Sequence, residues 1–63
     1  MDYPTEMYDE QLRKLAKWKY DDAMQAMSNA VITARIGDYR ASERYTASAS
    51  KCLADAEYYE KQL

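Results

Sequence analysis

The stretch ARIGDYRASERYTAS, residues 34–48, decides the fold of this 63-residue chain. It contains the only glycine, Gly37, and it separates two long segments with helical periodicity. A glycine just after the last periodic residue is a common left-handed helix stop, and an aspartate that follows it is a good N-cap. Gly37 and Asp38 therefore predict a corner between two antiparallel helices. The alternative is that they form the tip of a small β-hairpin.

Outside this stretch the chain favours long helices. Good helix formers such as Ala, Met, Lys, Glu and Gln are plentiful, and no glycine or proline follows Asp38. Pro4 suits the start of a helix. We therefore predict an all-α fold, an antiparallel two-helix hairpin with helices over about 5–36 and 38–62. Residues 1–63 form one small domain, and residues 1–4 are its leader.

The larger apolar residues of the first segment recur with the 4, 3, 4, 3 spacing of a heptad seam. They are Tyr20, Met24, Met27, Val31 and Ala34. A second stripe, of alanines, runs beside them at Ala16, Ala23, Ala26 and Ala30. We expect the stripe of larger residues to face the second helix.

The second segment carries its own seam with the same alternation of spacings. Its residues are Tyr45, Ala49, Cys52, Ala56, Tyr59 and Leu63. When the segments are folded back about Gly37, large residues of the first seam come opposite small residues of the second. Such interdigitation is what a tight helix pair needs, so the two seams together predict the hairpin interface.

A single hairpin leaves several apolar residues over. These interaction-surface candidates are Leu12, Leu15, Trp18, Ile32, Ile36 and Leu53. A chain of this length buries a small core, and its single cysteine cannot form an intrachain disulfide. We therefore expect self-association, with two hairpins forming a homo-oligomeric four-helix bundle, or docking on a larger protein.

Two resemblances bear on the corner. Residues 37–49, GDYRASERYTASA, resemble the turn and second helix of a tetratricopeptide repeat, which we interpret as convergent because no second copy is present. Residues 45–53, YTASASKCL, and residues 23–27, AMQAM, resemble W-type head-completion proteins of tailed phages. That resemblance implies a helix–β-hairpin–helix fold, with strands near 30–36 and 39–45, and a virion role at the head–tail joint. Against it, YRASER is poor strand material.

Enzymatic chemistry is not expected. The chain has no histidine and no glycine-rich phosphate loop, and its adjacent carboxylates, such as Asp21 and Asp22, are typical of a solvated helix face. Cys52 lies on the predicted seam, which suits a small packed residue better than a nucleophile. We predict no catalytic residue, metal site, cofactor or small-molecule substrate.

Charge and hydropathy limit the kinds of partner that we expect, and they bear on nucleic acid and membranes. The net charge of −2 disfavours nucleic acid, although Arg35, Arg40 and Arg44 near the corner, with Tyr39 and Tyr45 among them, form a candidate basic tip for RNA or DNA. No segment has the roughly 20 apolar residues that span a membrane. A lone cysteine and an acidic N-terminus favour the cytoplasm.

The functional expectation is a non-enzymatic helical module for protein–protein interaction. The phage resemblance suggests an accessory protein of a phage or other mobile element, an assembly factor or an inhibitor of a host protein, located in the host cytoplasm or the virion. The alternatives are a head–tail joining protein and a small RNA- or DNA-binding hairpin.

The predicted seams can be tested by placing a charge in each of them. Val31→Asp and Ala49→Asp should each unfold or dissociate the hairpin, because an unpaired carboxylate would enter an apolar interface. Far-ultraviolet circular dichroism and sedimentation measure the two effects. Indifference to both substitutions would reject the seams.

Overall fold

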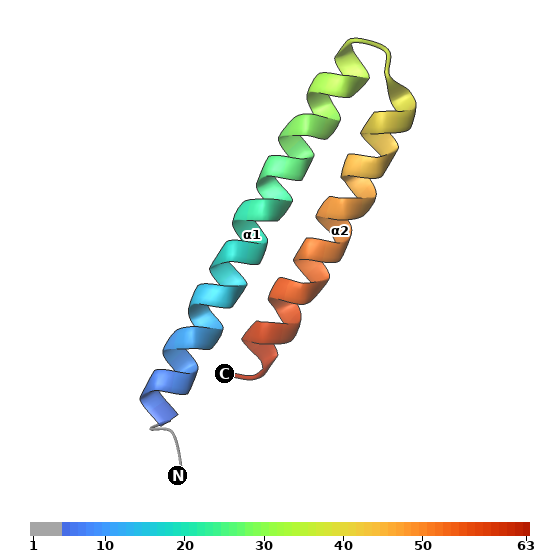
Figure 1. The fold of residues 1–63 in the computed structure, drawn as a ribbon. Helices are drawn as coiled ribbons and strands as arrows, with labels where there is room; N and C mark the ends of the chain where they lie inside the picture. Colours follow the sequence, from blue (N-terminus) through green and yellow to red (C-terminus); the bar gives the residue numbers. More distant parts are fainter. Residues whose placement is uncertain (1–4) are drawn as a thin grey trace.

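Two antiparallel α-helices form the part of the chain described by the computed structural model, residues 5–63 (Figure 1). Helix α1 runs from Thr5 to Arg35, and helix α2 from Tyr39 to Lys61. They lie side by side in a rod of 53 × 15 × 13 Å. The predicted all-α hairpin is confirmed, with helix bounds within a residue of those expected. The expected leader, residues 1–4, lies outside the described residues.

The corner between the helices combines a stop and a cap. Gly37 has a φ of +86°, the left-handed conformation that glycine adopts without a steric penalty. Its N–H donates to the carbonyl of Ala34 at 3.1 Å, and the N–H of Asp38 donates to the carbonyl of Thr33 at 2.8 Å, which together make a Schellman motif. The Asp38 carboxylate then accepts from the N–H of Ala41 at 3.2 Å and caps α2.

The β-hairpin alternative is wrong. Residues 39–45 lie in the first two turns of α2, residues 30–35 lie in the last turns of α1, and the described residues contain no strand. The physical reason lies in residues 40–44, where Arg, Ala, Ser and Glu fit a capped helix better than a strand. The fold implied by the resemblance to head-completion proteins is therefore not the fold of this chain.

Small side chains line the interface between α1 and α2. All but one of the buried apolar residues are alanines, and no large side chain in the described part of the chain is completely buried. The buried set consists of Leu12, Ala16, Ala23, Ala26, Ala30, Ala49 and Ala56. Alanine lets two helix backbones approach closely, because the distance between helix axes depends on the side chains at the contact.

The predicted seam of α1 is therefore corrected. Met24, Met27 and Val31 are exposed by 69%, 53% and 51%, and the alanine stripe faces α2 in their place. Both stripes have helical spacing, but the alanines meet Ala49 and Ala56 at a shorter distance than methionines could.

The alanines at the centre of the predicted α2 seam are buried, whereas the residues towards its ends are more exposed. Ala49 and Ala56 are buried, Cys52 and Tyr59 are half-buried, and Tyr45 is exposed, with 37% of its surface in water. In α1, Tyr20 is half-buried at the border of the interface. The interface is thus narrow, with alanine along most of its length, Leu12 buried towards the open end, and the other larger side chains along its margins.

Two polar contacts join the helices outside the apolar interface. The Ser42 hydroxyl donates to the carbonyl of Ala30 at 2.9 Å, close to the corner. The Lys19 ammonium lies 3.7 Å from the Asp55 carboxylate, and both side chains keep about a third or more of their surface in water. An ion pair this exposed contributes little, so packing rather than charge holds the hairpin together.

The expectation for Val31→Asp changes with this structure, because Val31 does not lie between the two helices. The substitution should leave the isolated hairpin helical, whereas Ala49→Asp should still disrupt it, since Ala49 is only 3% exposed.

The alanine interface predicts an effect of size as well as of charge. Ala56 is fully buried, so Ala56→Leu should destabilise the hairpin by about 1–3 kcal/mol through overpacking. Ala47→Leu on the exposed side of α2 is the matched control and should be nearly neutral. Urea denaturation followed by circular dichroism measures both. Equal stability of the two variants would contradict an alanine-tight interface.

Candidate interaction surface

A shallow, open, largely apolar groove lies on α1, on the part of the helix nearest the corner. We call this surface the outer face of α1, and its lining residues are Met24, Met27, Ser28, Val31, Ile32 and Arg35. Its four large apolar side chains are each more than half exposed. α2 contributes no residue to the groove, so the outer face is one side of a single helix.

The outer face exists because α1 carries two apolar stripes and α2 can cover only one. A helix with one apolar stripe buries that stripe against one neighbouring helix. A helix that is apolar on two sides is normally buried on both. The alanine stripe binds α2. The stripe of methionine, valine and isoleucine is then left in water, which is unfavourable for side chains of this size.

The residues predicted to form an interaction surface are divided by the structure. Ile32 lies on the outer face, and Ile36 is exposed at the end of α1. Trp18 is 61% exposed and lines a second shallow hollow with Gln11, Lys14 and half-buried Leu15. This second hollow is separate from the outer face and lies nearer the open end of the hairpin.

Two of those predicted residues are corrected. Leu12 is 5% exposed and belongs to the interface with α2, so it is not free to bind a partner. Leu53 is half-buried on α2, at the margin of the same interface.

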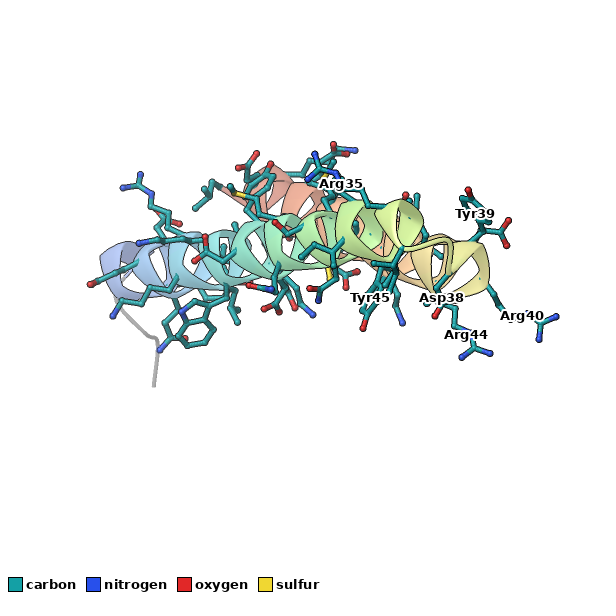
Figure 2. The ribbon with its side chains drawn as sticks, turned by 90° about the horizontal axis from the view of Figure 1, so that it is seen from above. Arg35, Asp38, Tyr39, Arg40, Arg44 and Tyr45 are labelled. Atoms are coloured by element: carbon teal, nitrogen blue, oxygen red, sulfur yellow. The ribbon has the colours of Figure 1, made fainter. Side chains whose placement is uncertain are left out.

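The three arginines of the expected basic tip do not gather into one patch. Arg40 and Arg44 point to one side of the hairpin, whereas Arg35 points to the opposite side (Figure 2). Asp38 lies on the same side as Arg44 (Figure 2). Arg35 instead closes one end of the outer face. Because nucleic-acid affinity depends on several cations acting together, the divided tip weakens that alternative.

Tyr20 is the one described group whose titration is clearly shifted. Partial desolvation between the helices raises the pKa of its hydroxyl above the ordinary value of 10.0. The neighbouring Glu60 carboxylate raises the pKa further, and the negative charge of Glu57 acts in the same direction. These effects favour the protonated phenol at the border between α1 and α2.

The described residues offer no cluster of side chains suited to holding a metal ion. No group of three or more Cys, Asp or Glu side chains converges within residues 8–63. Cys52 is half-buried and forms no disulfide. Neither α1 nor α2, as described, is apolar enough over a sufficient length to cross a membrane.

Comparison of the chain with protein-family models, with curated proteins and with solved structures found no match. The candidate surface is therefore interpreted from its own geometry.

Sequence reasoning did not place Met24 and Ser28 on an exposed surface of α1. The signal was present in the two parallel stripes of α1, since a helix in a simple hairpin needs only one. The interhelical contacts of Ser42 and Lys19 had no comparable signal, because a single polar residue on a helix does not reveal its partner.

The shifted titration of Tyr20 can be measured directly. The phenolate absorbance of the wild type minus that of Tyr20→Phe isolates this group, and its midpoint should lie above 10.0. Glu60→Gln should lower that midpoint, because it removes a carboxylate that favours the protonated phenol. The pKa is raised in the folded state, so the stabilising contribution is complete below the ordinary pKa and is lost as the pH rises through the raised one. A midpoint at or below 10.0 would contradict the contact.

Proposed function

We propose that this protein is a non-enzymatic module for protein–protein interaction that binds a partner through the outer face of α1. The observation that carries the proposal is the inversion of side-chain size, with alanines inside and large apolar residues outside. Met24, Met27, Val31 and Ile32 are all more than half exposed, while six of the seven apolar residues buried in the described part of the chain are alanines. Exposed apolar patches of this kind mark interaction sites.

The energetics favour a covered outer face. Removing the exposed part of each of these four side chains from water gains about 1 kcal/mol per side chain. The hairpin itself gains less from its core than usual, since alanines bury little apolar area. A helix pair of this kind is marginal on its own, so a partner contributes stability as well as specificity.

The shape of the surface favours a helix as the bound element. The groove is open and shallow and follows a single helix, and its apolar residues recur at the i, i+3, i+7 and i+8 positions, which lie on one side of a helix as the anchors of helix recognition do. Methionine suits such a surface because its side chain is flexible and fits irregular neighbours. A bundle of packed helices, the arrangement expected from the sequence, follows from this mode of binding.

The small size of the chain suits an accessory role in a phage or mobile element, which remains part of this proposal although the fold of the head-completion proteins is not its fold. An assembly factor or an inhibitor would use the same surface.

Site-specific photocrosslinking tests the proposed function while the partner is still unidentified. A benzophenone amino acid at Met24 should form protein adducts in the source cells, because this position is 69% exposed on the outer face. The same amino acid at Ala47, which is exposed on α2, is the control. Mass spectrometry identifies the adduct. Equal yields from the two positions would overturn the proposal.

A further inference from the structure

A stripe of five residues along α1 is symmetric about its own centre. Counted along the chain, the spacings are three, four, four and three, and Ser28 stands in the middle. The order is acid, large apolar, small, large apolar, base. All five side chains are exposed, and they are Asp21, Met24, Ser28, Ile32 and Arg35. We call them the symmetric stripe.

The spacing places all five on one side of the helix, since residues separated by three, four or seven positions share a face. Four of the five also line the outer groove. Asp21 lies seven positions before Ser28, two turns along the same side. The stripe therefore continues the outer face from residue 21 to residue 35, about 21 Å at 1.5 Å per residue.

We propose that the partner on the outer face is a second copy of this chain, packed with its α1 antiparallel to the first and with the two-fold axis at Ser28. This inference rests on the proposed function and names its partner. In an antiparallel pair centred on Ser28, each Met24 meets Ile32 of the second copy, and each Asp21 meets Arg35. The contact is isologous, so the same residues serve both copies.

Charge selects this orientation over the parallel one. Antiparallel packing brings two carboxylates to two guanidinium groups, one pair at each end of the stripe. Parallel packing would set Arg35 beside Arg35 and Asp21 beside Asp21, and like charges across an interface are unfavourable. The ion pairs found within the hairpin are Lys14–Glu10 and Lys19–Asp55, so neither Asp21 nor Arg35 belongs to one in the described part of the chain.

Side-chain size points to the same centre. Ser28 is the smallest residue of the symmetric stripe, and a small residue on the two-fold axis lets the helices approach. The large residues Met24 and Ile32 lie on either side of it, one turn away. Met27 and Val31 flank the stripe and line the same groove, so they would be covered by the same contact.

Cysteine crosslinking tests the centre of the contact. In the full chain with Cys52→Ser, Ser28→Cys should form a disulfide-linked dimer rapidly under mild oxidation, because the two sulfurs meet near the axis. Arg35→Cys alone should not, since its copies lie about 21 Å apart along the helix. A mixture of Asp21→Cys and Arg35→Cys should give the mixed dimer. Ala47→Cys, on α2, is the off-face control.

Charge reversal tests the orientation independently, in the wild-type background. Asp21→Arg and Arg35→Asp should each weaken dimerisation in sedimentation equilibrium, on the order of tenfold, because each puts like charges opposite one another at both ends. The double variant Asp21→Arg/Arg35→Asp should recover most of the wild-type affinity. Circular dichroism of each variant confirms that α1 and α2 remain helical.

The outcomes separate this inference from the proposed function. A disulfide at Ser28 but not at Arg35, with recovery in the double charge variant, supports the antiparallel dimer. Efficient crosslinking at Arg35 alone indicates parallel packing and overturns it. A helical monomer at micromolar concentration, or a photocrosslink from Met24 to a different protein, also overturns the second copy as partner. That last result would leave the proposed interaction function standing.

Discussion

The close approach of α1 and α2 through alanine is the constraint on which the rest of the structure depends. Where Ala23, Ala49 and Ala56 are packed in the interface, little room is left between the helices for a larger apolar side chain. The corner at Gly37 turns the chain so that the small residues of the two helices come opposite one another. The position of most other apolar residues follows, because large side chains lie at the margin or outside, apart from Leu12, which is buried towards the open end of the hairpin.

That constraint links the fold to its proposed role. A hairpin held by small residues has a thin core and gains little from burial, yet it presents large side chains on a rigid helix. An outward-facing apolar stripe on a regular helix is a better binding surface than one on a loop, because its side chains keep fixed spacing. The small apolar area buried in the core and the large apolar side chains left on the outer face of α1 have the same cause. The stripe of α1 that packs against α2 consists mainly of alanine.

Local signals were sufficient for much of this architecture. The Gly37–Asp38 pair specified both the stop of α1 and the cap of α2, since the left-handed stop and the N-cap depend on neighbouring residues only. The centre of the α2 seam could also be predicted from the sequence, because α2 has one apolar stripe. The side of α1 that faces α2 could not be predicted, because α1 has two stripes with the same helical spacing. Which one packs inward depends on the distance between the helices, and a heptad pattern does not encode that distance.

The sequence by itself determined that the chain forms two helices joined by a tight corner, that it lacks histidine, and that it has more apolar residues than one hairpin can bury. Only the tertiary structure decided which of these residues remain exposed. Packing assigned Leu12 to the core and Met24 to the surface, and it separated Arg35 from Arg44 (Figure 2). The physical reason is that helix formation depends on neighbours along the chain, whereas burial depends on how closely a second helix can approach.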